Sequence, residues 1–286
     1  HATLRVTGRA APHSEVAVVV DGDVAHAQQV QASATGRWQA TLALGDMIDA
    51  HVQHRVVAWS SSAQAASAAR TFRAAPHWRL VADVPGRTNE ARGPTGHYSA
   101  PLGTGWGDLL PLTLRRTRVW AAGGALKVAL TMGRISNVWN PPNGFDHVAF
   151  TLFVQVPGLG PGLAEMPLQN ARLPEGMTWN LRLRANGWTN ALFSTQGASA
   201  THEGTAQSPG AQLAVDARSR TVTFTLPASA LGNPATLAGV RLYATTWDYD
   251  GGYRPLTPQP GPGSFGGGDG ARDALVMDET GVIGVR

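Results

Sequence analysis

The sequence predicts an all-β fold built from two β-sandwich domains. Glycine and proline account for 34 and 19 of the 286 residues, and they interrupt the chain too often for long helices. Between these interruptions lie short segments in which apolar and polar residues alternate, as they do in half-buried strands. Hydrophobic residues make up 43% of the chain, which is enough to form buried cores.

Residues 1–76 form the first predicted domain. Its strands are expected at Thr3–Thr7, Glu15–Val20, Gln28–Ala32, Arg37–Leu44, His51–Ser60 and Ala69–Ala74. Asp21-Gly22 is a strong hairpin signal between neighbouring strands. The segment SATGRWQATLAL resembles a central strand of bacterial immunoglobulin-like modules, and the resemblance implies that Trp38 fills the core. Trp59 and Trp120 also lie inside predicted strands, and we expect them in the cores as well.

Residues 77–286 form the second, larger predicted sandwich, with about ten short strands and long loops. The strands are expected at His77–Val84, 109–122, Ala125–Met132, His147–Val156, Thr178–Arg184, Asn190–Ser194, Gln212–Val215, Thr221–Pro227, Leu237–Thr246 and Val276–Val285. Because His147–Val156 is the most apolar of them, we expect it at the centre of a sheet. Pro227–Leu231 is expected to form one helical turn.

Composition and charge exclude several classes of protein. The net charge is +4, but Lys127 is the single lysine and no run of basic residues occurs, so the sequence lacks a nucleic-acid footprint. Cysteine is absent, which excludes disulfides and a cysteine nucleophile. No apolar stretch reaches the length of a membrane span.

The stretch Ala244–Asp278 is too rich in proline and glycine to continue as a helix or strand. A loop of this length in a compact domain is usually functional or disordered, and this one carries aromatic residues beside spaced aspartates. The residues concerned are Trp247, Tyr249, Tyr253 and Phe265, with Asp248, Asp250, Asp269, Asp273 and Asp278. Flat rings with polar edges suit sugars, and clustered carboxylates suit Ca²⁺. The loop therefore predicts a sugar platform, a calcium site, or both.

Motifs across the second domain are similar to those of a known family. They are Asp83, the Gly-rich segment Gly93–Tyr98, Gly107-Asp108-Leu109, Asn137-x-Trp139, Asn143-Gly144-Phe145, Gly187-Trp188, Thr246-Trp247-Asp248, Arg254-Pro255, Phe265–Gly268 and Asp278. Together they resemble the C-terminal, DOMON-like module of glucodextranase and related amylase-family glycoside hydrolases. In place of the family's acidic pair before the Gly-Pro, this chain has residues 87–90, Arg-Thr-Asn-Glu.

The resemblance implies a non-catalytic accessory region of a secreted or periplasmic enzyme that acts on α-glucans. Its partners are expected to be an α-glucan or other polysaccharide and the catalytic domain of the hydrolase. The expected carbohydrate-binding residues are Trp139, Trp188, Trp247, Tyr249, Tyr253 and Arg254. The expected ligands of a Ca²⁺ ion are Asp83, Asp108, Asp248, Asp250 and Asp278. No catalytic domain is recognisable, because no GxSxG elbow occurs and no pair of carboxylates has an informative context.

Two alternatives remain open at this point. The chain can be a structural module that docks on its enzyme or on the cell surface without binding sugar. It can also be a periplasmic haem or copper protein, with haem ligands drawn from Met132, Met166, Met277, His97 and His147, or with copper held by His1 as the mature N-terminus.

Overall fold

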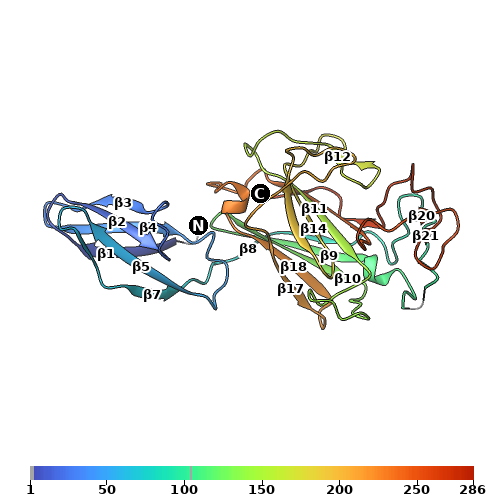
Figure 1. Cartoon of the computed structure of the whole chain (residues 1–286), viewed down its shortest axis with the longest axis horizontal. Coiled ribbons are helices and arrows are strands. Elements are labelled where there is room, and N and C mark those ends of the chain that lie inside the picture. Colours follow the sequence, from blue (N-terminus) through green and yellow to red (C-terminus); the bar gives the residue numbers. More distant parts are fainter. Residues whose placement is uncertain (1–2, 104) are drawn as a thin grey trace. The chain divides into compact units, whose positions relative to one another are not determined.

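The computed structural model describes residues 3–103 and 105–286, and it is an all-β fold of two compact units (Figure 1). The first unit extends to Trp78 and also includes Ala122–Ala125, and the second comprises Arg79–Ala121 and Leu126–Arg286. In the described part of the chain no helix has the length and hydrophobicity needed to cross a membrane.

The first unit is a small sandwich of two antiparallel sheets. One sheet pairs β1 with β4, and the other has the order β3-β2-β5-β6 with β7 also paired to β5. The strands are β1 (Thr3–Arg9), β2 (Glu15–Val20), β3 (Gln28–Gln31), β4 (Arg37–Ala43), β5 (Gln53–Ser60), β6 (Ala65–Ala66) and β7 (Arg70–Arg73). Val16, Trp38 and Val56 are among the buried residues that hold the two sheets together.

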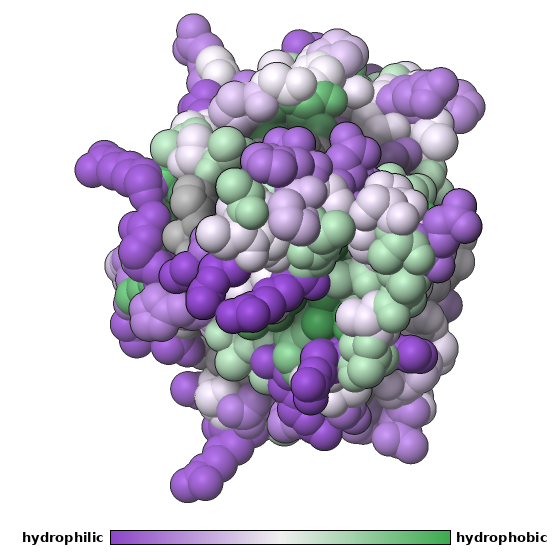
Figure 2. All heavy atoms as spheres, turned by 90° about the vertical axis from the view of Figure 1, so that its left-hand side faces the viewer, coloured by the Kyte–Doolittle hydropathy of each residue, from purple (hydrophilic) through white to green (hydrophobic). Residues whose placement is uncertain are grey.

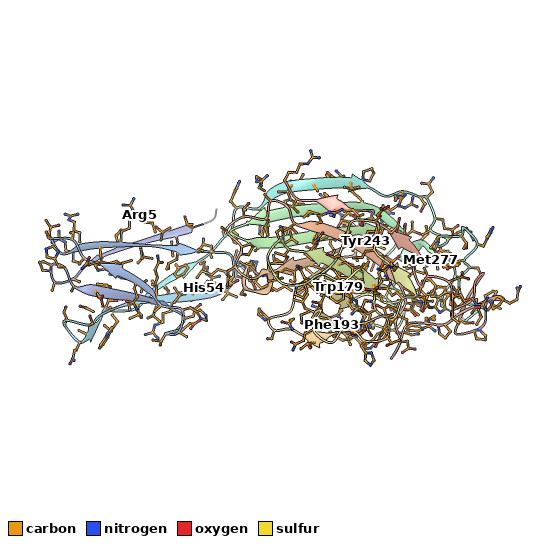
Figure 3. All side chains as sticks on the ribbon, turned by 90° about the horizontal axis from the view of Figure 1, so that it is seen from above. Arg5, His54, Trp179, Phe193, Tyr243 and Met277 are labelled. Carbon is orange, nitrogen blue, oxygen red and sulfur yellow. The ribbon has the colours of Figure 1, made fainter. Side chains whose placement is uncertain are left out.

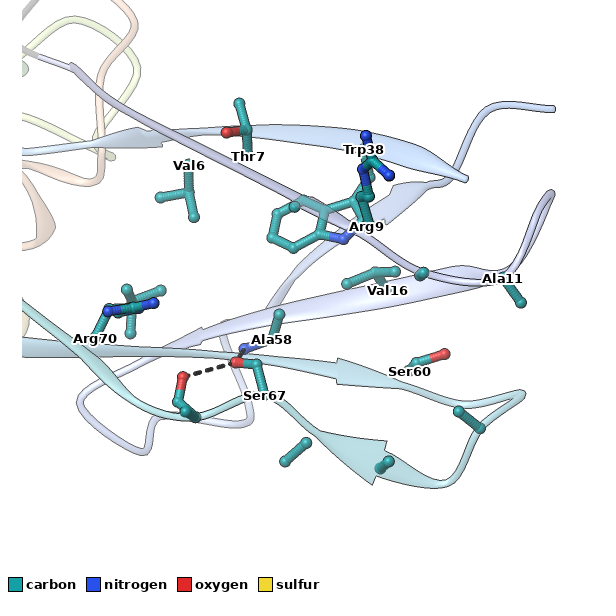
Figure 4. Close-up of a pocket in the computed structure, with 17 residues that line it drawn as sticks. Val6, Thr7, Arg9, Ala11, Val16, Trp38, Ala58, Ser60, Ser67 and Arg70 are labelled. Atoms are coloured by element: carbon teal, nitrogen blue, oxygen red, sulfur yellow. Dashed lines mark hydrogen bonds between the residues drawn. The ribbon is translucent and has the colours of Figure 1, made fainter. Parts of the chain in front are cut away.

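Trp38 lies in the core of this unit, as the sequence predicts, and its indole packs directly against the backbone of Gly8. A Cβ added at Gly8, its partner on β1, would lie only 2.3 Å from the indole Cζ2. Trp38 also lines a hollow of about 420 Å³ between the sheets (Figure 4). Trp59 differs from the prediction: it is 42% exposed, because on β5 the alternate residues His54 and Val56 face inward.

The second unit is a larger sandwich of a five-stranded and a seven-stranded sheet. The first sheet has the order β17-β18-β10-β9-β8, and the second has the order β16-β15-β14-β11-β19-β22, with β23 also paired to β19. The first sheet contains β8 (Arg79–Pro85), β9 (Leu114–Ala122), β10 (Ala125–Met132), β17 (Gln212–Asp216) and β18 (Thr221–Leu226). The second contains β11 (Ala149–Gln155), β14 (Leu181–Ala185), β15 (Asn190–Ser194), β16 (Thr205–Ala206), β19 (Arg241–Trp247), β22 (Asp278–Glu279) and β23 (Ile283–Gly284).

Short elements lie in the connections of this unit. They are the strand pairs β12 (Glu165–Met166) with β13 (Ala171–Arg172) and β20 (Leu256–Thr257) with β21 (Phe265–Gly266), and the 3-10 turns η1 (Leu110–Leu112) and η2 (Ser229–Leu231). The prediction of a helical turn at Pro227–Leu231 is confirmed by η2. The single closing strand predicted at Val276–Val285 is two short strands, β22 and β23, and both pair with β19.

Strand β11 is central, as its composition predicts, and it is buried on both faces. Leu152 and Val154 point into the main core between the two sheets. Phe153, between them, belongs to a second cluster with Trp179 and Tyr243 (Figure 3). Met166 and Met177, in the connection between β11 and β14, complete this cluster, so the connection covers the outer face of the seven-stranded sheet.

Candidate functional site

Two loops of the second unit, one between β10 and β11 and the other between β14 and β15, are joined by hydrogen bonds. The loop between β10 and β11 contains Asn143, whose backbone N–H donates to the carbonyl of Gly187 at 2.9 Å, while its side-chain Nδ2 donates to the carbonyl of Asn186 at 2.7 Å. Asn186 in turn accepts, through Oδ1, the N–H groups of Trp188 and Thr189, both at 2.8 Å. Asparagine side chains commonly stabilise turns in this way, so each Asn-Gly pair builds one loop and ties it to the other.

Gly187 allows the close approach of these loops. A Cβ at this position would lie 2.4 Å from the carbonyl oxygen of Phe145 and 2.7 Å from Cγ of Pro141. Both distances are shorter than van der Waals contact, so any larger residue would push the loops apart.

These two hydrogen-bonded loops carry two exposed tryptophans that lie beside each other. Trp139 is 48% exposed and Trp188 is 51% exposed, and their ring centroids are 6.3 Å apart with the planes tilted by 38°. Val138, next to Trp139, is 60% exposed and extends the apolar surface. We call Trp139 and Trp188 the tryptophan pair; large apolar side chains held in the open usually mark a binding surface.

A buried polar group supports Trp139 from below. The ring of His147 lies 4.4 Å from the indole of Trp139, with the planes tilted by 34°, and also 4.4 Å from that of Trp106, with the planes nearly perpendicular. Nδ1 of His147 lies 2.7 Å from Asp146 and 2.8 Å from the hydroxyl of Ser136. The other carboxylate oxygen of Asp146 accepts the backbone N–H of Trp139 at 2.7 Å, so both the ring and the backbone of Trp139 are fixed.

The electrostatics of Asp146 favour its ionised form. Burial by itself raises the pKa of this carboxyl, but hydrogen bonds from Ser136, the Trp139 N–H and His147 outweigh burial and hold the pKa below its usual value. Because the carboxylate accepts at Nδ1, that nitrogen carries a proton, and Nε2 of His147 has no hydrogen-bond partner in the described residues.

A hollow of about 470 Å³ adjoins the loop of Trp139: Val138 is part of its lining, although neither ring of the tryptophan pair is. The loop around Trp106 forms one wall, and Arg134, Ser136 and Asn137 contribute polar groups from the other. Arg134 donates to the carboxylate of Asp108 at 3.1 Å. The hollow therefore places hydrogen-bonding side chains next to the apolar side chain of Val138.

Tyr249 and Tyr253 are brought together, over buried arginines. Their rings meet edge to face at 5.3 Å, and the guanidinium of Arg184 lies 4.0 Å from the ring centroid of Tyr249. Arg184 forms a two-fold ion pair with Glu203 at 2.7 and 3.0 Å. Arg182, which is fully buried, donates to the hydroxyl of Tyr253 at 3.2 Å and lies 3.5 Å from the same glutamate. These tyrosines therefore pack on the protein's own cations.

Trp247 is enclosed by the fold, which corrects its prediction as a sugar contact, and Arg254 is engaged with groups of the protein itself. Trp247 is 1% exposed and packs against Phe265 at 4.6 Å, so its ring has no surface to offer. The indole donates to the carbonyl of Arg254, and the guanidinium of Arg254 pairs with Asp248 and lies 5.1 Å from the ring centroid of Trp106. Burial raises the pKa of Asp248, although the guanidinium opposes this shift.

The carboxylates expected to bind calcium are not gathered by the fold. Three of them form ion pairs with arginines: Asp83 with Arg116, Asp108 with Arg134, and Asp248 with Arg254. The side chain of Asp278 accepts the backbone N–H of Leu114. Asp250 is exposed, and its carboxylate lies 3.8 Å from the guanidinium of Arg254. Among the described residues no three His, Asp or Glu side chains stand close enough to hold a metal ion. As placed, these residues do not fit a single calcium site. Calcium binding stays a prediction that metal analysis of the purified protein tests.

The residues considered for haem are also apart. Met132 and Met277 are buried in the main core, whereas Met166 belongs to the second cluster. His97 is exposed, and the ring of His147 is enclosed by two indoles. His1, considered for copper, lies outside the described residues.

The sequence analysis missed the supporting residues of the tryptophan pair. His147 was considered only as a haem ligand, and Asp146 and Ser136 carried no signal, because a single buried carboxylate has no sequence pattern. The Asn-Gly pairs at residues 143–144 and 186–187 did carry a signal, since both mark turns of defined geometry.

One comparison with known proteins identifies the chain's family. No curated protein matches the sequence. A family model described as the C-terminal, SLH-like binding module of glucodextranase matches residues 95–282, which is well over half of the chain and includes the tryptophan pair. The chain belongs to the family of C-terminal binding modules of glucodextranase.

Proposed function

We propose that this chain is a non-catalytic, carbohydrate-binding accessory region of an exported glycoside hydrolase that acts on α-glucans. The observation that carries the proposal is the exposed pair of Trp139 and Trp188 on two loops tied together by hydrogen bonds. Family membership supports a binding role, since the family is described as a binding module.

The chemistry of the pair suits a sugar chain. The apolar C–H face of a pyranose stacks on an indole, and each such contact contributes roughly 1 kcal/mol, as other aromatic contacts do. The rings are fixed before binding, so little conformational entropy is lost on association. Arg134 and Asn137 in the neighbouring hollow offer donors and acceptors to the hydroxyl groups of the bound sugar. So small a contact gives an affinity in the range of about micromolar to millimolar.

The same surface also favours a second candidate, docking on the catalytic domain of the enzyme. Val138, Trp139 and Trp188 form an apolar surface that a protein partner can cover as well as a sugar can. The two functions differ in their ligand, so a polysaccharide without any protein partner distinguishes them.

Affinity electrophoresis of the full chain in starch, dextran and pullulan gels tests the proposal. The wild type should be retarded in at least one gel, and the double variant Trp139→Ala/Trp188→Ala should lose roughly 30-fold in affinity, for a loss of about 2 kcal/mol. Trp59→Ala is the matched control, because Trp59 is 42% exposed but lies in the first unit. Absence of retardation in every gel would favour docking instead.

A further inference from the structure

The outer face of the β1–β4 sheet gathers three arginines, two from β1 and one from β4. On β1 and β4 the inward residues alternate with exposed ones, and the exposed set includes Arg5, Arg9 and Arg37. Arg9 and Arg37 stand directly opposite each other across the two strands. Like charges in this position repel each other, so the arrangement lowers stability unless a negatively charged group lies between them.

None of these three arginines has an acidic partner within the described residues. No carboxylate there forms an ion pair with Arg5, Arg9 or Arg37, whereas arginines of the second unit such as Arg92 and Arg172 are paired with glutamates. Figure 3 shows Arg5 projecting away from β1 to the outside of the unit. The guanidinium groups therefore remain available to an external anion.

The arginines surround a hollow of about 750 Å³, which we call the basic hollow. Its other polar lining residues are Thr7, His13, Gln31, Ser33 and Gln39, and none of the described residues that line it is acidic. Figure 2 views the molecule from the left-hand side of Figure 1, the side on which the first unit lies, and hydrophilic side chains project from its surface.

The frame that holds the basic hollow is rigid. The turn before β4 is closed by the N–H of Gly36 donating to the carbonyl of Ser33 at 2.8 Å and by the N–H of Ala10 donating to the carbonyl of Gly36 at 2.9 Å. The hydroxyl of Ser33 accepts the N–H of Arg37 at 3.1 Å. The backbone of Arg37 is thus held opposite that of Arg9.

We infer that the basic hollow binds an anionic polysaccharide through its carboxylate groups. Arg5 and Arg9 are four residues apart on one strand, which separates them by about 13 Å, so an extended polymer with repeated charges fits better than one small ion. The guanidinium forks match carboxylates, and the amide and hydroxyl side chains match sugar hydroxyls. Trp38 is 8% exposed and points inward, so the face lacks the ring needed to stack nucleic-acid bases. This site is separate from the tryptophan pair.

Affinity electrophoresis of the full chain in gels containing polygalacturonate tests the inference, with neutral dextran and single-stranded DNA as parallel probes. Retardation by polygalacturonate should weaken with added salt, because the contacts are exposed. The variant Arg5→Gln/Arg9→Gln/Arg37→Gln should lose about tenfold in affinity, as expected for three exposed ionic contacts. The corresponding triple lysine variant should retain part of the binding, since it keeps the charge but not the fork.

The control variant Arg92→Gln/Arg172→Gln/Arg272→Gln removes the same charge from arginines that are already paired with carboxylates. It should bind polygalacturonate like the wild type, and dextran retardation should be equal in all proteins. If the glutamine variant does not fold, Arg9→Gln/Arg37→Gln serves in its place, because it removes the repelling pair. The inference would be overturned if Arg5→Gln/Arg9→Gln/Arg37→Gln and the control variant lost the same affinity for polygalacturonate. It would also be overturned if Arg5→Gln/Arg9→Gln/Arg37→Gln bound polygalacturonate like the wild type, or if DNA retarded the protein and polygalacturonate did not.

Discussion

The imidazole of His147 lies against the indole of Trp139, with ring centroids 4.4 Å apart and planes tilted by 34°. The residue before it, Asp146, accepts the backbone N–H of Trp139. Two adjacent residues just before β11 therefore fix both parts of one exposed tryptophan. A ring held in this way keeps its orientation in the absence of ligand, which is what a binding surface needs.

Asp146 should make the stability of the protein depend on pH in the acidic range. Its pKa is below the usual value in the folded protein, so its stabilising contribution is present above the unfolded pKa of about 3.9 and is lost as the pH falls through the lower folded value. Asp146→Asn should lower the free energy of unfolding by about 1–3 kcal/mol at pH 6. The difference in this free energy between wild type and variant should become smaller as the pH falls below about 4. Calorimetric melting between these pH values measures both effects.

The control for this prediction is Asp250→Asn. The side chain of Asp250 is 81% exposed, so the substitution should leave the melting curve close to that of the wild type at every pH. A constant difference between wild type and Asp146→Asn over the whole range would contradict the assigned role of the carboxylate.

Gly187→Ala should disturb the tryptophan pair without touching either ring. The added methyl group would meet the carbonyl of Phe145 at 2.4 Å, so the loops must separate, at a cost of about 1–3 kcal/mol. We expect a lower melting temperature and weaker retention in α-glucan gels. Gly210→Ala is the matched control, since a Cβ at that position meets no described atom within 4 Å. Equal behaviour of the two variants would show that loop spacing does not matter.

Glu203→Gln should be one of the most destabilising single substitutions in the second unit. Glu203 is the carboxylate that faces both Arg182 and Arg184, and Arg182 is fully buried. Loss of its charge leaves two guanidinium groups unneutralised, at a cost of about 3–5 kcal/mol in the free energy of unfolding. Chemical denaturation measures this change.

Glu165→Gln gives the comparison, because the Glu165–Arg172 pair is exposed, with the arginine side chain 68% accessible. Its loss should cost at most about 1 kcal/mol. A cost for Glu203→Gln as small as that for Glu165→Gln would mean that water or another group already neutralises the cluster.

Limited proteolysis should separate the two units. The fold divides the chain between Trp78 and Arg79, close to the predicted boundary between residues 76 and 77. We expect early cleavage near residues 74–79, followed by a stable fragment of the second unit, and mass spectrometry identifies the site. Cleavage that begins inside the long loop after Trp247 would count against a separable first unit.

The positions of most strands and the central place of β11 were accessible from sequence, but burial on the second face of a sheet was not. Leu181–Ala185 alternates leucine with arginine, which is the pattern of a half-exposed strand, yet both arginines are buried beneath Phe193 and the tyrosines. Sequence alternation records which residues share a face; it does not record that another segment covers the polar face.

The tryptophans illustrate the same limit. Trp139 and Trp188 were predicted as candidates from their places in loops, and the structure brings them together because two asparagine-built turns contact each other. Trp247 was predicted with them, but β21 and the segment around Tyr98 enclose it. Contacts between separate loops and strands leave no periodic trace in the sequence.

Tryptophan footprinting on the wild-type protein tests the proposed carbohydrate site most directly. Of the nine tryptophans, Trp59, Trp139 and Trp188 are exposed, so mild oxidation followed by peptide mass analysis should modify these three first. Addition of the α-glucan that retards the protein in gels should slow the oxidation of Trp139 and Trp188 and leave the rate at Trp59 unchanged. Oxidation of Trp139 and Trp188 at an unchanged rate in a saturating concentration of that glucan would contradict the account.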